Sequence, residues 1–335
     1  MSLSYSPTAI KGVVVEQVFT ELLFENKTIA DSLVSFHEGV KYDTLFTEES
    51  MTATQQAYVA TAPSASGTLT LADTAIIPIK VMYYDELNPE TLRSSRFKRD
   101  MASGAYNIMS GEFNQLLMSV IAPKVSYDLE SKFWNNITSA TQTAIAALTP
   151  GTGQTSVGAS EQAYAAALTA GLFDGVVTRM IYNGGALGTR VKYLGTTITA
   201  SNIGAEYAKI YAAIPAKTLN QANEKPLLYA PYSHKQYMIA ANIAATYRDV
   251  FMVDIASDTF AYNGVKVVFV PLPENCVIAA LPSNIHWICD MKSDINALTI
   301  DKIAANREDI FYKMVMTEFA HVTRQNANVL YLYSA

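Results

Sequence analysis

Histidine is the residue type best suited to acid–base or metal chemistry near neutral pH, and the chain has four. They are far apart in the sequence: His37, His234, His286 and His321. None lies in a His-x-x-x-His pattern, which would place two imidazoles on one helix face, and His37-Glu38 lacks the second histidine of a zinc-protease helix. The sequence therefore assigns no metal ligand and no general base to any of them.

The other groups that could carry chemistry are equally isolated. The segment Gly151–Gly158 is a glycine-rich loop that could cradle a phosphate, but it lacks the Gly-Lys-Ser/Thr ending and follows no hydrophobic strand. Cys276 and Cys289 show no nucleophile signature and no disulfide or metal spacing, and there is no Gly-x-Ser-x-Gly elbow. The carboxylate pairs Glu48-Glu49 and Asp85-Glu86 are interpreted as solvated. We therefore predict no catalytic, cofactor-binding or metal-binding residue, no cofactor and no enzyme activity.

Signals for secretion or membrane insertion are also missing. Asn26-Lys27-Thr28 and Asn136-Ile137-Thr138 match the glycosylation acceptor. However, Glu16 and Glu21 interrupt the apolar residues near the N-terminus, and no basic stretch precedes them, so no signal peptide is predicted. The long uncharged stretch Phe133–Ser160 is rich in Ser, Thr, Asn and Gly and would not enter a bilayer. We expect synthesis in a cytoplasm, with both thiols buried and reduced.

The composition is unusually apolar. Half of the 335 residues are hydrophobic (50%) and 16% are charged, against about 25% in an average soluble domain. The 20 tyrosines are typical of interfaces, since tyrosine is apolar in its body and polar at its tip. We infer that partners cover much of the surface; an unusually large core is the alternative. The net charge of −6, with Lys and Arg interpreted as scattered, argues against a protein that grips nucleic acid.

One long helix dominates the predicted elements. Apolar residues recur at steps of three and four from Phe113 to Ile137, which predicts an amphipathic helix of about seven turns. Ser110 is its expected N-cap, and Pro123 is expected to kink or divide it. We interpret the apolar face as core.

Strands and short helices are predicted around this helix. Residues 58–87 are interpreted as a strand pair around the turn-rich segment 63–67, and Pro78 indicates an edge strand or a projecting hairpin. The segment Lys27–Phe36 is predicted to be a helix within an otherwise extended start of the chain. Asn263-Gly264 predicts a hairpin turn. The remaining helices are expected at Asn202–Ile214, capped by Ser201 or Asn202, and Tyr232–Asn242, capped by Ser233. The remaining strands are expected at 226–230, 265–270, 277–280, 297–303, 310–322 and 329–333.

The order of these parts carries a resemblance over nearly the whole chain, without one decisive motif. Its residues are the arm Met1–Ser50, the hairpin with base strand Asp73–Leu87, the helix ending in Phe133-Trp134-Asn135-Asn136, Gly171–Gly175, Leu228–His234, Tyr262–Pro273, Ile278–Ala280 and Asn306–Asp309 between two strands. In this layout the chain resembles the major capsid protein of tailed double-stranded DNA bacteriophages, which has the Hong Kong ninety-seven fold.

The resemblance implies an α+β fold in five parts. They are an N-terminal arm (1–50), an extended loop or hairpin (51–98), a peripheral domain with the spine helix (99–139), an axial domain (140–292) and the closing strands of the peripheral domain (293–335). Some relatives join subunits through a Lys–Asn bond. Lys80 lies in the hairpin region, but nothing marks its partner.

The implied function is structural. Copies of the chain would form the hexamers and pentamers of an icosahedral head shell that encloses double-stranded DNA without sequence-specific binding. The implied location is the virion, after synthesis in the host cytoplasm and with no membrane contact. A separate scaffolding protein, a portal and decoration proteins are the other implied partners. The alternatives are an encapsulin-type bacterial nanocompartment shell, a cytosolic enzyme of unrecognised family, and a phage tail or adhesin component.

Overall fold

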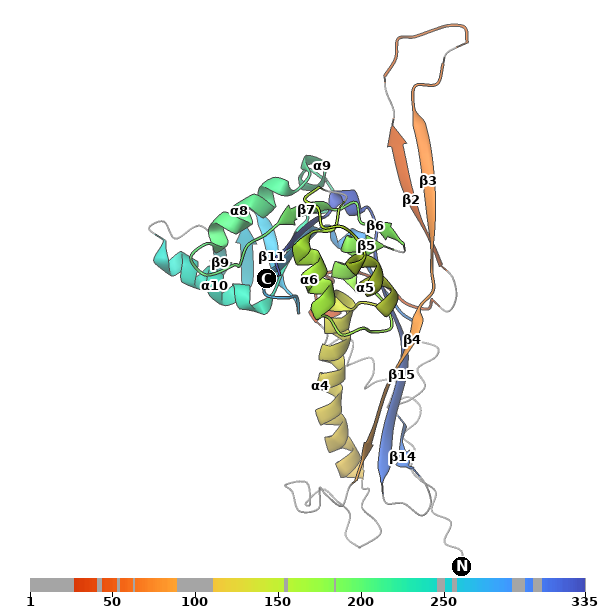
Figure 1. The fold of residues 1–335 in the computed structure, drawn as a ribbon, viewed down its shortest axis with the longest axis vertical. Coiled ribbons are helices and arrows are strands. Elements are labelled where there is room, and N and C mark those ends of the chain that lie inside the picture. Colours follow the sequence, from red (N-terminus) through yellow and green to blue (C-terminus); the bar gives the residue numbers. More distant parts are fainter. Residues whose placement is uncertain are drawn as a thin grey trace, which may run out of the picture.

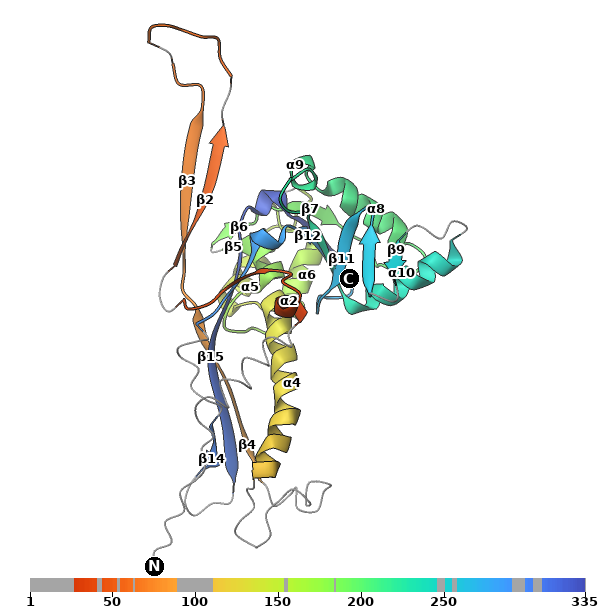
Figure 2. The same cartoon turned by 180° about the vertical axis from the view of Figure 1, so that it is seen from behind.

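The computed structural model describes residues 27–40, 44–52, 55–62, 64–88, 111–153, 156–183, 185–245, 251–254, 258–290, 299–303 and 309–334. A two-stranded hairpin projects from one end of the body, a rod made of one helix and long strands extends from the other, and a mixed lobe lies to the side (Figures 1 and 2). Most of the predicted arm, the expected cap Ser110 and most of the Asn306–Asp309 turn fall outside the described residues.

The long helix is confirmed as α4, Gly111–Asn135, which is the helix of the rod in Figure 1. Pro123 lies inside it, and the helix continues on both sides of this residue. Val125, Leu129 and Phe133 are buried, as their spacing of four on one helix face requires. Ile137, just beyond the helix end, is fully buried as well.

A five-stranded sheet accompanies α4 along the rod. Its longest strand is β15 (Ile310–Val322), which pairs antiparallel with β4 (Ile79–Leu87) along residues 310–318 and with β13 (Ile285–Ile288) along residues 319–322. β14 (Thr299–Lys302) pairs with residues 310–313 of β15, and β1 (Ser35–His37) runs parallel to β13.

The projecting hairpin is made of β2 (Thr44–Thr52) and β3 (Thr68–Ile76), in register from Thr44↔Ile76 to Thr52↔Thr68. The prediction that the strand pair lies within residues 58–87 is therefore wrong: Tyr58 and Val59 are not in a strand, and β4 pairs with β15. Pro78 separates β3 from β4, where no ladder hydrogen bond is required of it. The sequence does not predict β2, because its apolar residues Leu45, Phe46 and Met51 do not alternate regularly with polar ones.

The side lobe is built on a seven-stranded sheet with the order β7-β16-β12-β8-β11-β10-β9. The strands are β7 (Val191–Leu194), β16 (Val329–Leu332), β12 (Cys276–Ala280), β8 (Leu227–Ala230), β11 (Val265–Phe269), β10 (Thr259–Tyr262) and β9 (Met252–Asp254). The predicted Asn263-Gly264 turn joins β10 to β11, with positive φ angles of 47° and 79°.

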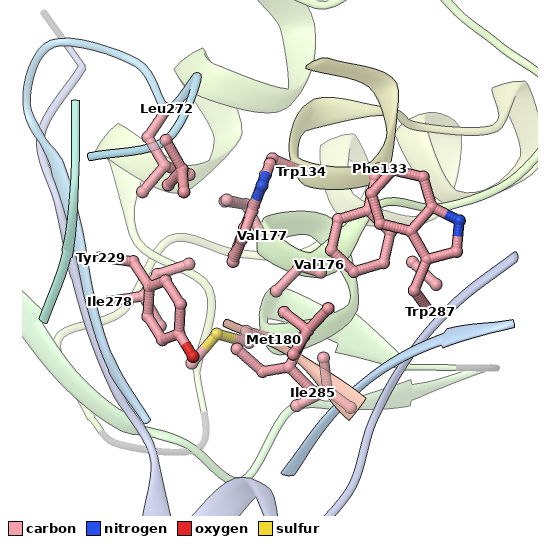
Figure 3. Packing of buried hydrophobic residues seen from close by; sticks show 14 of the residues in the cluster. Phe133, Trp134, Val176, Val177, Met180, Tyr229, Leu272, Ile278, Ile285 and Trp287 are labelled. Atoms are coloured by element: carbon pink, nitrogen blue, oxygen red, sulfur yellow. The ribbon is translucent and has the colours of Figure 1, made fainter. Parts of the chain in front are cut away.

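This sheet separates two hydrophobic cores. Along β12, Cys276, Ile278 and Ala280 face one core, and Val277 and Ala279 face the other. The first core joins the sheet to α4 and α7 (Val176–Ile181) and contains Phe133 and Trp287, which stack with ring centroids 4.1 Å apart (Figure 3). The second core lies under α8 (Ile203–Ala213) and α10 (Tyr232–Ala244).

Short elements complete the fold, and two of them correct predictions. Helix α2 covers only Lys27–Ala30, because Ser32 takes a positive φ of 51° and β1 begins at Ser35, so the predicted helix Lys27–Phe36 is wrong. Ser233 does not cap α10, which Pro231 precedes. The others are α5 (Ser139–Ala146), α6 (Ala159–Ala167), β5 (Tyr182–Asn183), β6 (Ala186–Leu187), α9 (Ala216–Leu219) and the 3-10 turns Pro282–Asn284 and Gln325–Ala327.

The predicted division into five parts stays a prediction, and two strands near its boundaries show how the sheets interlock. β13, inside the range 140–292, pairs with β1 and β15. β16, inside the range 293–335, pairs with β12 and β7.

Candidate assembly surfaces and the residues around them

The hairpin β2–β3 is exposed on both faces. Leu45, Leu69 and Leu71 are 63%, 61% and 56% exposed, and within β3 only Ile76 is buried. Leu69 and Leu71 share a face because side chains two apart along a strand point the same way. A two-stranded ribbon without a covered face is at best marginally stable in water. The hairpin thus presents apolar groups that this chain does not cover.

The charge of the hairpin has one sign. Between Thr44 and Ile76 the acidic residues are Glu48, Glu49 and Asp73, and there is no Lys, Arg or His. A surface that covers this ribbon would therefore be apolar and neutral or basic, because like charges at an interface are costly.

Two further places combine exposed apolar side chains with a strand edge. On β4, Met82 and Tyr84 are 56% and 46% exposed, whereas Tyr83 points toward α4 and donates a hydrogen bond to Asp128 Oδ2 at 2.7 Å. At the side lobe, Ile243 of α10 and Met252 of the edge strand β9 are largely exposed.

The tyrosines divide between core and surface. Among the described residues, five tyrosines are buried: Tyr164, Tyr207, Tyr229, Tyr262 and Tyr331. Four are among the exposed residues: Tyr58, Tyr84, Tyr127 and Tyr232. The large internal core is therefore observed, whereas the expectation that partners cover the exposed apolar surface stays a prediction.

The glycine-rich loop is structural in its described part. Lys192 Nζ donates to the carbonyl oxygens of Gly151 (2.9 Å) and Ser156 (3.1 Å), and Glu161 accepts from the N–H of Gly158 (2.7 Å). The loop therefore turns carbonyls toward a cation, the opposite of the N–H groups that hold a phosphate. Glu161 also pairs with the fully buried Arg190, so one carboxylate stands between two buried cations.

The other residues that the sequence analysis considered do not form a common site in the described part of the chain. Asn136 is buried, which accounts for one of the two glycosylation matches, and Cys276 and Cys289 are buried free thiols. Burial raises the pKa of the Cys276 thiol. Lys80 is exposed on β4. Glu86 accepts from the hydroxyl of Tyr84 at 2.7 Å.

The structure brings three of the four histidines together, which the sequence did not indicate. His37, His286 and His321 lie on β1, β13 and β15, neighbouring strands from distant parts of the chain, and His286 stands opposite His321 in register. His37 Nε2 and His286 Nδ1 share a hydrogen bond of 3.0 Å. His234 lies in the side lobe, bonded to Tyr207 and to the carbonyl of Glu274.

The described residues contain neither a candidate metal site nor a helix that could span a membrane. No group of three or more His, Cys, Asp or Glu side chains there could hold a metal ion. Nor is any helix within these residues long and apolar enough to cross a membrane.

The interpretation of the basic residues as scattered is wrong at one place. Arg93, Arg96, Lys98 and Arg99 form a local run, which lies outside the described residues.

Comparison with known proteins gives a structural answer only. No family model and no curated protein matches the sequence. Among solved structures, a chain of Gordonia phage Cozz matches with a TM-score of 0.55 and 11% identity, covering 92% of this chain and 87% of that one. The capsid of the native GTA particle matches with 0.52 and 12%, covering 100% and 96%.

A third match is the satellite phage P4 procapsid including the size determination (Sid) protein, with a TM-score of 0.51 and 10% identity over 94% and 97% of the two chains. Identities this low show the fold alone. The chain has the Hong Kong ninety-seven fold of tailed-phage capsid proteins, as the α+β prediction expected.

Proposed function

We propose that this chain is the major capsid protein of a tailed bacteriophage, a structural subunit with no catalytic step. Copies of it would build the icosahedral head shell around double-stranded DNA. One observation carries the proposal beyond the fold: the hairpin β2–β3 projects away from the body (Figures 1 and 2), and the exposed Leu45, Leu69 and Leu71 share one of its faces. A projecting two-stranded ribbon of this kind would gain stability by lying on another molecule.

The proposed mechanism is the burial of surface between copies. The hairpin of one subunit would lie on the body of the next, a head-to-tail contact that forms rings when its rotation closes. Hexamers and pentamers are the two closures that an icosahedral shell needs. A stable interface buries about 1,600 Å², and here the hairpin, the β4 face and the side lobe would share such burial among several neighbours. The exposed Leu69, Met82 and Ile243 are their apolar anchors.

The charge balance suits a container. With a net charge of −6, the subunit would not bind the DNA phosphates tightly. Packaging requires such weak binding, without preference for any DNA sequence. Synthesis in the host cytoplasm, a separate scaffolding protein, a portal and decoration proteins belong to the same proposal. So does the division into arm, extended loop, spine helix, axial domain and closing strands.

Electron microscopy of the expressed chain, alone and with the products of neighbouring genes, tests the proposal. We expect closed spherical particles. The double variant Leu69→Ser/Leu71→Ser should remain folded and lose assembly, because it removes apolar contact area from one hairpin face. The matched control Leu69→Met/Leu71→Met keeps that area and should still assemble.

Other results would point elsewhere. A stable single-copy species under all conditions, seen by analytical ultracentrifugation, would contradict a shell protein and reopen the enzyme alternative. Rods would favour a tail component. Spheres that contain a protein cargo in place of DNA would favour an encapsulin-type nanocompartment.

A further inference from the structure

The base of the hairpin rests on the three histidines brought together by the five-stranded sheet, which we call the histidine cluster: His37, His286 and His321. The ring of Phe46, from β2, lies against all three. Its centroid is 5.3 Å from that of His37, 4.8 Å from His286 and 5.5 Å from His321. Phe46 is partly buried while its neighbours Leu45 and Thr47 are exposed, so this face of β2 turns toward the body.

A second contact lies two residues further along the same face. Glu48 Oε1 accepts a hydrogen bond from the backbone N–H of Arg324 at 3.2 Å. Phe46 and Glu48 therefore attach the hairpin base to the part of the body where β1, β13 and β15 meet. Beyond them the ribbon projects freely, as Figure 2 shows.

The hydrogen bonds of the cluster suit neutral imidazoles. His286 uses both ring nitrogens, Nδ1 with His37 Nε2 and Nε2 with Thr323 Oγ1 at 3.1 Å. His321 is 1% exposed, and neither of its ring nitrogens has a hydrogen-bond partner. A protonated imidazole has two N–H donors to satisfy. A proton on His321 would therefore create a buried cation without an acceptor, which is costly.

The charged groups around the cluster oppose additional positive charge. The positive charge of Arg324 lowers the pKa of His286, and that of Arg179, from α7, lowers the pKa of His321. Of the two acids of β2, Glu49 is exposed, and the carboxylate of Glu48 accepts from the backbone N–H of Arg324. On the sheet itself, Glu38 follows His37 with an exposed side chain. Two acids lie further along the strands, the buried Glu318 on β15 and the buried Asp290 after β13.

We infer that the histidine cluster is a proton-sensitive latch for the hairpin: neutral imidazoles hold Phe46 and the hairpin base against the body, and acidification releases them. The cluster lies at the base of the hairpin, away from Leu69, Met82 and Ile243, to which the proposed function assigns assembly. The latch would therefore control the orientation of the hairpin relative to the body, independently of what the hairpin binds.

The direction of the pH effect follows from the pKa values. Burial lowers the pKa of His37; burial, with His37 and Arg324 nearby, lowers the pKa of His286 to about 4; burial, with Arg179 and His286 nearby, lowers the pKa of His321 to about 3. A released, solvated imidazole returns to a pKa of about 6.5. The released state binds more protons below that pH, so the latch is fully stable above pH ~6.5 and weakens as the pH falls toward 4.

A distance measurement on the full, unassembled chain tests the latch without depending on shell formation. Both native cysteines are buried, so nitroxide labels can be attached at Thr61→Cys on the hairpin and Ala216→Cys on the body, both exposed positions. Double electron–electron resonance should give a narrow distribution of distances between the two labels at pH 7.5. This distribution should broaden between pH 6 and 4. A label pair within the body, Ala216→Cys and Lys266→Cys, should keep its distance throughout.

Three variants separate the latch from general acid unfolding. Phe46→Ala should lose the narrow distance already at pH 7.5. His321→Phe keeps an aromatic ring that cannot be protonated and should move the release to lower pH. His234→Gln is the matched control, because His234 is also buried with a pKa lowered to about 4, but lies in the side lobe. Its hairpin response should equal that of the unmodified chain.

Three outcomes would overturn the inference. The hairpin distance could stay narrow at pH 4 while the body remains intact. The body pair could broaden at the same pH as the hairpin pair, which would mean unfolding. Finally, His321→Phe could release at the same pH as the unmodified chain, in which case these imidazoles are not the proton sensor.

Discussion

The hairpin β2–β3 and the strand β12 show two ways in which one chain uses β-structure. All five residues of β12 are buried, and alternate side chains enter two separate cores. Along β3, eight of the nine residues are exposed, although its ladder with β2 is complete. Hydrogen bonds between strands are thus similar in both places, while apolar burial differs. The chain's own cores thus cover β12, whereas the chain leaves most of β3 uncovered.

This comparison divides the expected effects of substitutions. Changes in the cores should lower the free energy of unfolding, since burial is the main favourable term in folding. Changes on the hairpin should leave unfolding almost unaltered and act on association.

The largest effect is expected from Phe133→Ala. Phe133 is fully buried and stacks on Trp287, so its removal leaves a cavity in the first core. Unfolding should become easier by about 3–5 kcal/mol. Denaturant unfolding of the unassembled chain measures this. The control is Tyr127→Ala on the same helix, 61% exposed, which should change stability by less than ~0.5 kcal/mol. Equal losses in both variants would remove the distinction between core and surface.

A somewhat smaller effect is expected from Glu161→Gln. The substitution leaves Arg190 and Lys192 buried without their carboxylate, which should cost about 3 kcal/mol. The matched control is Asp258→Asn, which breaks an exposed pair with Lys235 and should cost below ~1 kcal/mol. Thermal unfolding of both variants checks the difference, and similar midpoints would contradict it.

The turn between β10 and β11 should show a modest effect. Gly264 has a φ of 79°, and an added Cβ would meet no atom within 4 Å, so Gly264→Ala carries only the conformational cost of about 1 kcal/mol. Gly264→Asn should cost less, because asparagine tolerates this backbone region better. Unfolding curves that rank the two in the opposite order would count against the assignment of the turn.

The smallest effect on unfolding should come from the hairpin variant Leu69→Ser/Leu71→Ser. Both side chains are exposed, so the free energy of unfolding should change by less than ~0.5 kcal/mol while particle formation is lost. Calorimetry of the unassembled chain checks the first part. A large loss of stability would mean that the hairpin face with Leu69 and Leu71 already packs on its own body.

Sequence reasoning succeeded where a pattern is local. The spine helix followed from steps of three and four, because one of its faces is buried, and Asn263-Gly264 marked its turn because few residues accept positive φ. It failed for β2, which was included in the arm, because its apolar residues do not alternate regularly with polar ones: Leu45 and Phe46 are adjacent, and Thr, Glu and Ser follow them. It also failed for α2. The spacing of Ile29, Leu33 and Phe36 predicted a longer helix, but the helix ends at Ala30 and Phe36 lies in strand β1.

By itself, the sequence determined the long helix and most strands of the sheets, since each depends on residue type within a short window. The tertiary structure alone decided which strands pair, that Glu161 lies between two buried cations, and that three histidines meet under Phe46. These depend on contacts between segments up to hundreds of residues apart, and no local spacing encodes them.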